Sequence, residues 1–278
     1  MKITPRTFRE AKNKRKLALL TAYDYGLARL IDECGIDGIL VGDSLGMTTL
    51  GYSDTIPVTM EDMIHHCAAV SRGAKNALII CDMPFMSSQL GPLETVRNAG
   101  RLLKEGGAQA VKLEGGAEFA PEIAALTRAS IPVMAHIGLT PQSARAMGGY
   151  KVQGKSLAEA KKVLNDARAL EEAGAFAILM ECVPAPLARL ITSGVSVPTI
   201  GIGAGSHCDG QILVWQDMLG VSPGTPPKFV RRFAELGQTM REAFDDYKRS
   251  VETGEFPAPA HSYAMSDEVA DALTTEEK

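Results

Sequence analysis

Short apolar runs alternate with amphipathic stretches along most of this chain. The runs are nearly continuous in aliphatic residues, which is typical of strands covered on both faces of a parallel sheet. Between them, apolar residues recur at the three- to four-residue spacing of helices. Eight runs are predicted as strands, over residues 16–24, 38–43, 77–82, 110–115, 131–137, 176–182, 197–205 and 211–217. Strands that alternate with helices in this way predict parallel pairing through helical crossovers.

Helix boundaries are marked most clearly around one central segment. Ser156 precedes it and Glu159 follows three residues later, which is a capping box. Its predicted apolar stripe consists of Leu157, Ala160, Leu164, Ala167 and Leu170. Gly174 is suited to the left-handed position that ends a helix. A last long helix is expected over about residues 227–253, ending at Gly254.

The length of the chain, 278 residues, matches the roughly 250 residues of a (β/α)8 barrel. A hydrophobic content of 45% is enough for a sizeable core. No linker or residue-level repeat divides the sequence, so residues 1–264 are predicted to form one α/β TIM-barrel domain. Residues 265–278 are acidic and weakly apolar, and we expect this tail to be disordered.

Composition excludes several classes of partner. The net charge of -4 argues against a nucleic-acid binder, since such domains usually carry a basic face. No run approaches the roughly 18 apolar residues of a membrane span, and no secretory signal is visible at the start. The five cysteines are odd in number and form no CxxC motif, which favours reduced thiols in a cytoplasmic protein.

Polar residues stand where the predicted strands end. Asp43, Asp82, Glu114, His136 and Glu181 close the second to the sixth strand in turn. Functional residues of a (β/α)8 barrel come from these carboxyl ends. Because alternate residues of a strand face the same side, Lys112 and Glu114 point together, away from Val111 and Leu113. The pattern predicts a polar cluster in the mouth of the barrel.

Three of these residues are hard oxygen ligands. Asp43, Asp82 and Glu114 suit Mg²⁺, which takes one or two carboxylates directly and keeps several waters, so Glu114 is a candidate for binding through water. The alternative is that each acid caps the helix after its strand. The repetition at three successive strand ends favours the metal site.

The remaining polar residues each allow more than one interpretation. Lys112 could form a Schiff base, anchor an anionic substrate or balance Glu114; the nearby acids would keep it protonated, which favours anchoring. His136 could bond a substrate oxygen or be a buried core histidine. Glu181 leaves an apolar wall, which suits a general base, although it could also cap a helix.

Two glycine-rich segments are also candidates. Residues 201–211, "GIGAGSHCDGQ", are consistent with a phosphate-binding loop or with a tight turn. Residues 140–156, "TPQSARAMGGYKVQGKS", exceed the usual length of a strand-to-helix loop and contain Gly148, Gly149 and Gly154. This segment could close over the mouth as a lid.

Several segments together resemble the ketopantoate hydroxymethyltransferase family. They are "TAYDY", "VGDSLGMTTLGYSDTIPVTMEDM", "CDMPFMS", "AVKLEGG", "AHIGLTPQS", "GGYKVQG", "MECVP" and "IGIGAG", in the expected order over roughly residues 20–226. The resemblance implies a barrel of the phosphoenolpyruvate/pyruvate group. It also implies transfer of a hydroxymethyl group from 5,10-methylenetetrahydrofolate to 3-methyl-2-oxobutanoate, through a Mg²⁺-stabilised enolate, to give 2-dehydropantoate.

The resemblance further implies roles for individual residues. Asp43, Asp82 and Glu114 would bind Mg²⁺; Asp43, Ser44, Asp82 and Lys112 would contact the keto acid, with His136 close by; Glu181 would be the proton acceptor. A cytoplasmic homo-oligomer, commonly a decamer, is implied as well. The alternatives are a Mg²⁺-dependent lyase or aldolase that needs no folate, and a non-catalytic barrel that binds a keto acid.

Overall fold

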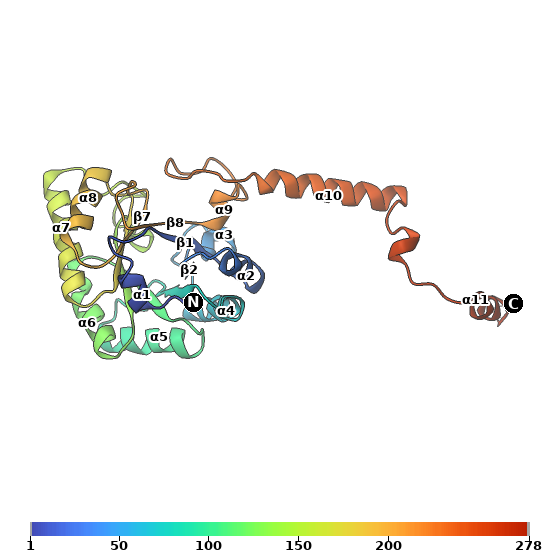
Figure 1. The fold of residues 1–278 in the computed structure, drawn as a ribbon, viewed down its shortest axis with the longest axis horizontal. Coiled ribbons are helices and arrows are strands. Elements are labelled where there is room, and N and C mark those ends of the chain that lie inside the picture. The colour runs from blue at the N-terminus through green and yellow to red at the C-terminus, as the bar shows by residue number, and fades with distance from the viewer. Residues whose placement is uncertain (1, 277–278) are drawn as a thin grey trace. The chain divides into compact units, whose positions relative to one another are not determined.

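The computed structural model describes residues 2–276, and its centre is a closed parallel barrel of eight strands in chain order. Each strand pairs with the next, and β1 pairs with β8 to close the barrel (Figure 1). The strands are β1 Leu17–Thr21, β2 Gly38–Val41, β3 Leu78–Asp82, β4 Ala110–Glu114, β5 Val133–Gly138, β6 Ala177–Glu181, β7 Thr199–Ile202 and β8 Gly210–Leu213. The eight predicted strands and the TIM-barrel class are confirmed.

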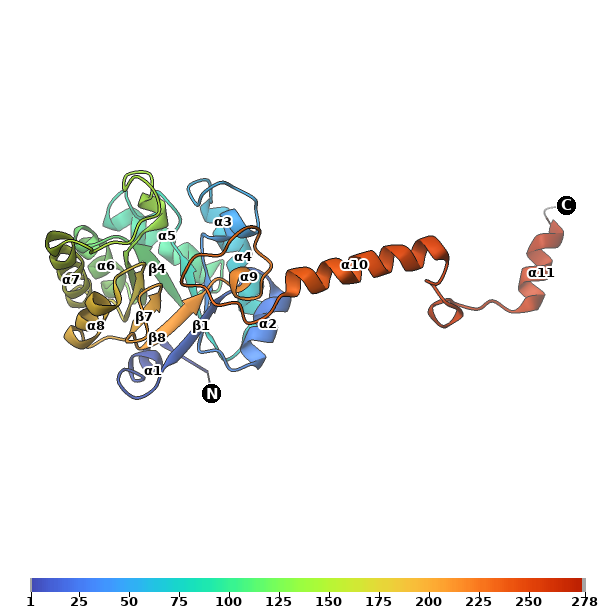
Figure 2. The ribbon, with the colours of Figure 1, turned by 90° about the horizontal axis from the view of Figure 1, so that it is seen from above.

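Helices surround the barrel on its outer side (Figure 2). They are α1 Pro5–Arg9, α2 Tyr25–Glu33, α3 Leu45–Thr48, α4 Met60–Gly73, α5 Pro92–Lys104, α6 Ala120–Arg128, α7 Leu157–Glu172, α8 Ala185–Gly194 and α9 Trp215–Met218, with 3₁₀ turns η1 Ala117–Phe119 and η2 Pro141–Ser143. The predicted capping box at Ser156 and Glu159 is present at the start of α7. Leu157, however, is 73% exposed and lies outside the buried stripe.

No helix links β7 to β8 in the described chain, which corrects the expectation of a helix between every pair of strands. Residues 203–209 can span at most about 25 Å when fully extended. That length suffices to return along a short strand but leaves no room for a helical crossover. Segment 201–211 therefore contains the short connection between the parallel strands β7 and β8.

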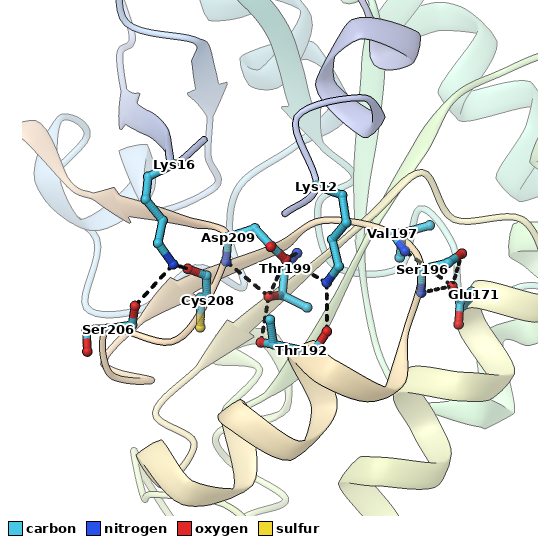
Figure 3. Close-up of polar contacts among 10 residues, drawn as sticks. All are labelled: Lys12, Lys16, Glu171, Thr192, Ser196, Val197, Thr199, Ser206, Cys208 and Asp209. Carbon is cyan, nitrogen blue, oxygen red and sulfur yellow. Dashed lines mark hydrogen bonds and ion pairs between the residues drawn. The ribbon is translucent and has the colours of Figure 1, made fainter. Parts of the chain in front are cut away.

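Two lysines that precede β1 hold this return segment in place (Figure 3). The Lys12 ammonium lies 2.8 Å from Asp209 Oδ2, and both side chains are over 90% buried. Asp209 Oδ2 also accepts a hydrogen bond from the backbone N–H of Thr199 at 2.8 Å. Lys16 donates to the carbonyl of Cys208. The segment before β1 thus ties the last two strands together.

The apolar core has an inner and an outer part. The outer part lies between strands and helices and includes Val111 and Leu113. The inner part fills the barrel with Phe8, Ala11, Leu17, Leu19, Leu40, Leu78, Ile80, Ala110, Met134, Phe176, Ala177, Leu179, Ile200 and Ile212. Phe8 and Phe176 meet edge to face at 5.7 Å, with Phe8 reaching in from α1. The N-terminal end of the barrel is therefore closed by side chains.

The C-terminal segment forms a compact unit of its own, consisting of residues 219–221 and 232–278, of which 277–278 lie outside the described residues. It contains α10 Leu236–Thr253, a 3₁₀ turn η3 Pro259–His261 and α11 Asp267–Glu276. The predicted end of the long helix at Gly254 is confirmed by a left-handed backbone there.

Two expectations for this part of the chain differ from the structure. The long helix begins at Leu236 rather than near residue 227, because residues 222–231 belong to the barrel unit, where Phe229 packs against Gly203. The tail, expected to be disordered, contains α11. The domain boundary at residue 264 stays a prediction. Among residues 2–276, none of the helices combines the length and apolar character that crossing a membrane requires.

Replacing Lys12 with Met should destabilise the barrel, because Asp209 would remain buried without its counter-charge. Loss of one partner of a buried pair costs about 3 kcal/mol. Urea unfolding measures the change. Lys14→Met, at an exposed position nearby, is the control and should stay within about 0.5 kcal/mol of the unmodified protein. Equal stability of the two variants would contradict a structural role for the ion pair.

Candidate active site

Strand register brings the predicted polar residues together. Asp82 of β3 lies opposite Lys112 of β4. Two residues further along β4, Glu114 lies opposite His136 of β5. Two residues further along β5, Gly138 lies opposite Glu181 of β6. The paired positions therefore shift by two residues from each strand to the next, across β3, β4, β5 and β6. This register places the side chains in one row.

Lys112 is the cation at the centre of the cluster. Its Nζ lies 3.1 Å from Asp82 Oδ1, 3.3 Å from Glu114 Oε1 and 3.0 Å from His136 Nδ1. All four side chains are almost fully buried. The prediction that Lys112 and Glu114 face the same side is confirmed.

Burial and neighbouring charges shift the pKa values of these groups. Burial, with the charges of Glu114 and Asp82, holds the pKa of Asp43 well above its ordinary value. Burial likewise raises the pKa of Asp82, although Lys112 opposes it. For Glu114 burial is outweighed by Lys112 and His136, and its pKa falls to about 2. Burial would lower the pKa of Lys112, but the surrounding carboxylates raise it, so the ammonium stays protonated.

His136 connects this cluster to Glu181. Its Nε2 lies 3.3 Å from Glu181 Oε2, and its Nδ1 lies 3.3 Å from Glu114 Oε1. Burial and the charge of Lys112 would lower the pKa of His136, but Glu114 and the contact with Glu181 raise it. Because a lysine ammonium has no acceptor, a neutral His136 must accept at Nδ1 and carry its proton on Nε2, toward Glu181.

The backbone around Glu181 is tightly constrained. A Cβ at Gly138, which has φ +91, would lie 2.3 Å from the carbonyl oxygen of Glu181. That carbonyl accepts a hydrogen bond from the N–H of Leu139. Cys182, directly after Glu181, has φ +49, an uncommon conformation for a residue other than glycine. The Glu181 side chain is 18% exposed, so it lies at the mouth rather than deep within it.

Asp43 and Ser44 enter the site from the loop after β2. The Asp43 backbone N–H donates to Asp82 Oδ2 at 3.0 Å. Ser44 Oγ lies 2.9 Å from the hydroxyl of Tyr23, whose pKa burial raises to about 12. A Cβ at Gly42 would lie 2.8 Å from Ser44 Oγ and 3.4 Å from Asp82 Oδ2. A side chain at position 42 would therefore displace the Ser44 hydroxyl and press against the Asp82 carboxylate.

Helix capping does not account for these acids. The N-cap of α3 is Ser44, that of α5 is Gly91 and that of α8 is Pro184. Gly116 and Phe119 precede the turn and helix after β4. Neither Asp43, Asp82, Glu114 nor Glu181 occupies the cap position that the alternative interpretation requires.

Gln142 is a member of the site that the sequence analysis did not single out. Its Nε2 donates to Asp43 Oδ2 at 2.8 Å and to the carbonyl of Met83 at 2.9 Å. Its backbone N–H donates to Glu114 Oε2 at 3.1 Å. An uncharged residue inside "TPQS" carries little chemical signal. The sequence gives one indication of its role, which is that Gln142 lies at the start of the long loop after β5, near the carboxyl end of that strand.

The long loop 140–156 is fastened to the loop after β2. Arg145 forms an ion pair with Asp54 at 2.7 Å, and the Tyr150 hydroxyl lies 3.9 Å from Met47 Sδ. Burial raises the pKa of Tyr150, and the charges of Asp54 and Glu181 add to the shift. These contacts place loop 140–156 beside α3 and the loop that follows it; closure of the loop over the mouth stays a prediction.

The donor set fits a divalent cation. One oxygen of each carboxylate is held by an N–H group, which leaves Asp43 Oδ1, Asp82 Oδ1 and Glu114 Oε1 as the second oxygens. Of these, Asp82 Oδ1 and Glu114 Oε1 lie beside the Lys112 ammonium, at 3.1 and 3.3 Å, and Asp82 Oδ1 is buried without a hydrogen bond of good geometry. Within residues 2–276, no three His, Cys, Asp or Glu side chains are arranged so that they would by themselves hold a metal ion. The donors at this site are all carboxylate oxygens, which is the ligand type that hard divalent cations take.

A closed parallel barrel with charged residues at the carboxyl ends of its strands defines a (β/α)8-barrel enzyme. Solved structures show the same fold. Phosphonopyruvate hydrolase, solved in complex with oxalate and Mg²⁺, has a TM-score of 0.62 at 16% identity and covers 99% of this chain and 96% of its own. For 2,3-dimethylmalate lyase, a PEP mutase/isocitrate lyase superfamily member, the TM-score is 0.60 at 16% identity, with coverage of 100% and 99%.

The particular family follows from sequence comparison. A family model described as ketopantoate hydroxymethyltransferase matches residues 2–259, and the chain belongs to this family. A 3-methyl-2-oxobutanoate hydroxymethyltransferase of Clostridium novyi is 61% identical over 274 residues, which is 98% of this chain and 100% of that protein. One of Enterococcus faecalis is 59% identical over 274 residues with the same coverage.

Replacing Asp43 with Asn should stabilise the metal-free protein at pH 7.5 by about 1 kcal/mol. The raised pKa means that ionised Asp43 is less stable in the folded chain than in the unfolded one. Asp43 thus favours folding most at pH values below 3.8, its ordinary pKa, and this contribution is lost as the pH rises through the folded pKa.

Urea unfolding in EDTA at pH 7.5 and pH 4 checks the sign. The gain should be present at pH 7.5 and shrink at pH 4. Asp245→Asn, on the exposed side of α10, is the control and should change stability by less than about 0.5 kcal/mol. A loss of stability in Asp43→Asn at pH 7.5 would show that Asp43 is not under repulsion.

Proposed function

We propose that this protein transfers a hydroxymethyl group from 5,10-methylenetetrahydrofolate to 3-methyl-2-oxobutanoate and releases 2-dehydropantoate. Family membership over residues 2–259 and relatives named for this activity support the proposal. The observation that carries it is the buried row in which Lys112 and three carboxylates face Glu181 across His136. The row offers an anion anchor and a base, the two groups that enolisation of a 2-oxo acid requires.

Lys112 is proposed to anchor the substrate carboxylate. Its raised pKa keeps the amine protonated, which opposes Schiff-base formation and favours ion pairing. Ser44, held by Tyr23, and the side chains of Asp43 and Asp82 line the same space and are the other proposed substrate contacts. His136 orients Glu181 beside them.

Asp43, Asp82 and Glu114 are proposed to hold Mg²⁺, with Glu114 acting through water. When bound, the ion would act as a Lewis acid on the 2-oxo group and acidify the hydrogen on C3. The solved complex of phosphonopyruvate hydrolase with oxalate and Mg²⁺ supports a divalent cation in a barrel of this fold. Burial and the charges of Glu114 and Asp82 raise the pKa of Asp43, and a cation bound beside it would relieve the part that is due to charge.

Glu181 is the proposed general base. It takes the C3 proton, and the electron pair of the C–H bond moves into the enolate. The enolate carbon then attacks the methylene carbon of the folate, and the new C–C bond forms as one of the two C–N bonds of that carbon breaks; the freed nitrogen takes up a proton equivalent to the one removed from C3. Water then displaces the second folate nitrogen, which takes a proton of that water, so that a hydroxymethyl group and tetrahydrofolate are left. Partial exposure lets Glu181 reach a substrate at the mouth and return its proton to solvent.

Two other functions use the same residues. A Mg²⁺-dependent lyase or aldolase would enolise a 2-oxo acid without folate, and 2,3-dimethylmalate lyase shares the fold. A barrel that only binds a keto acid would need no base beside the substrate. Dependence on methylenetetrahydrofolate separates the first from the proposed function, and exchange at C3 separates the second.

We also propose that the protein acts in the cytoplasm as a homo-oligomer, with a decamer as the proposed size. Exposed apolar residues on α10 support association. They recur on one face, at Leu236, Met240, Phe244, Tyr247 and Val251. Such a stripe on an outer face is typical of a surface that another chain covers.

Replacing Glu181 with Gln should slow exchange of the C3 hydrogen by about 10²- to 10⁴-fold, because the base is lost. Proton NMR of 3-methyl-2-oxobutanoate in D₂O with Mg²⁺ measures this step without folate. Addition of methylenetetrahydrofolate should then produce the hydroxymethyl product with the unmodified protein. The control, Glu172→Gln on the outer surface of α7, should exchange at the normal rate.

The outcomes divide the alternatives clearly. Exchange without product would favour the lyase or aldolase. Binding without exchange would favour the keto-acid-binding barrel. Normal exchange in Glu181→Gln would remove Glu181 as the base while leaving the overall reaction in place.

A further inference from the structure

Gln142 holds the outer oxygens of two carboxylates at once. Its side-chain amide bonds Asp43 Oδ2, and its backbone N–H bonds Glu114 Oε2. The remaining oxygen of Glu114, Oε1, points to Lys112, while Oδ1 of Asp43 is left without a hydrogen bond to Gln142. A single residue thus fixes the rotation of two carboxylates that come from different strands.

The orientation of the Gln142 amide is determined by its surroundings. Nε2 faces two oxygens, Asp43 Oδ2 and the carbonyl of Met83, while Oε1 accepts a hydrogen bond from Gln89 Nε2 at 3.4 Å. A flipped amide would place its oxygen against both acceptors and its NH₂ against a donor. The side chain is 5% exposed, so water does not offer a substitute partner readily.

We propose that Gln142 is a positioning residue for the metal site. It holds Asp43 Oδ2 and Glu114 Oε2, which leaves Asp43 Oδ1 for a divalent cation and Glu114 Oε1 for Lys112, and it links occupation of the metal site to loop 140–156, in which it lies. The inference rests on the proposed metal site and adds a residue to it. Residues that orient metal ligands commonly contribute about 10- to 100-fold to metal affinity.

The link to the loop follows from the position of Gln142 in the chain. It lies in η2, three residues before Arg145, whose ion pair with Asp54 fastens the loop across the mouth. A cation that draws Asp43 and Glu114 inward fixes the two acceptors of Gln142. The start of the loop is then held at two points. Gln142 is bonded to Asp43 and Glu114, and Arg145 is paired with Asp54.

Gln142→Met tests the positioning role. Methionine preserves the length and approximate shape of the side chain but removes its N–H donors, and the backbone N–H to Glu114 remains. Mn²⁺, titrated into the metal-free protein and followed by the EPR signal of the free ion, is the probe. We expect the dissociation constant to rise about 10- to 100-fold. Gln153→Met makes the same chemical change in the same loop, where the side chain bonds only the carbonyl of Lys151, and should bind as the unmodified protein does.

The dependence of activity on Mg²⁺ concentration distinguishes a positioning residue from a catalytic one. C3 exchange by Gln142→Met should recover at saturating Mg²⁺, whereas that of Glu181→Gln should not. Mn²⁺ affinity in Gln142→Met equal to that of the unmodified protein would overturn the positioning role. Failure of the unmodified protein to bind Mn²⁺ would instead remove the proposed metal site.

Amide hydrogen exchange on the unmodified protein tests the link to the loop, and it does so even if Gln142→Met fails to fold. Mn²⁺ should slow exchange within residues 140–149, where the loop begins. Residues 203–209, held by lysines on the other side of the barrel core, are the internal control and should exchange at an unchanged rate. Equal exchange in loop 140–149 with and without Mn²⁺ would overturn the link.

Discussion

The ammonium group of Lys112 is the interaction on which the buried carboxylates at the mouth of this barrel depend. Asp43, Asp82 and Glu114 would repel one another strongly in the absence of Lys112, and a buried charge without a partner costs several kcal/mol. Lys112 offsets this repulsion only in part, because it is one cation among three carboxylates. The cluster therefore holds its carboxylates at a cost, which the raised pKa of Asp43 and of Asp82 reflects: both groups take up a proton more readily than they do in water.

Barrel geometry determines where that charge lies. The same inward-facing rows that carry Ile80 and Ala110 in the apolar interior carry Asp82 and Lys112 two residues further on. Apolar layers below thus exclude water from the polar layer above. The low local polarity strengthens each ion pair, and it also raises the pKa of Asp43 and of Asp82, the latter in spite of its ion pair with Lys112.

Residues on strands could be predicted from the sequence, because a strand of period two fixes both the face and the height of each side chain. Lys112, Glu114, His136 and Glu181 were found in this way. Gln142 and Tyr23 were not, because their roles depend on how loops fold back over the mouth and on uncharged hydrogen bonds. The absence of a helix between β7 and β8 could have been predicted, because the strands predicted at 197–205 and 211–217 leave only residues 206–210 between them. The periodicity of a strand thus predicts which of its residues face the site. The contacts that loops make with those residues depend on tertiary structure and cannot be predicted from periodicity.

The edge-to-face contact of Phe8 with Phe176 has a consequence for ligand traffic. It closes the N-terminal end of the barrel formed by the described residues, so a ligand of the buried row enters and departs through the mouth. Whatever binds beside Lys112 lies beneath whatever binds to the loops above it. If a second ligand binds over the mouth, as the proposed function requires, the ligand beside Lys112 would have to arrive before it, and this order would not depend on how tightly either ligand is held.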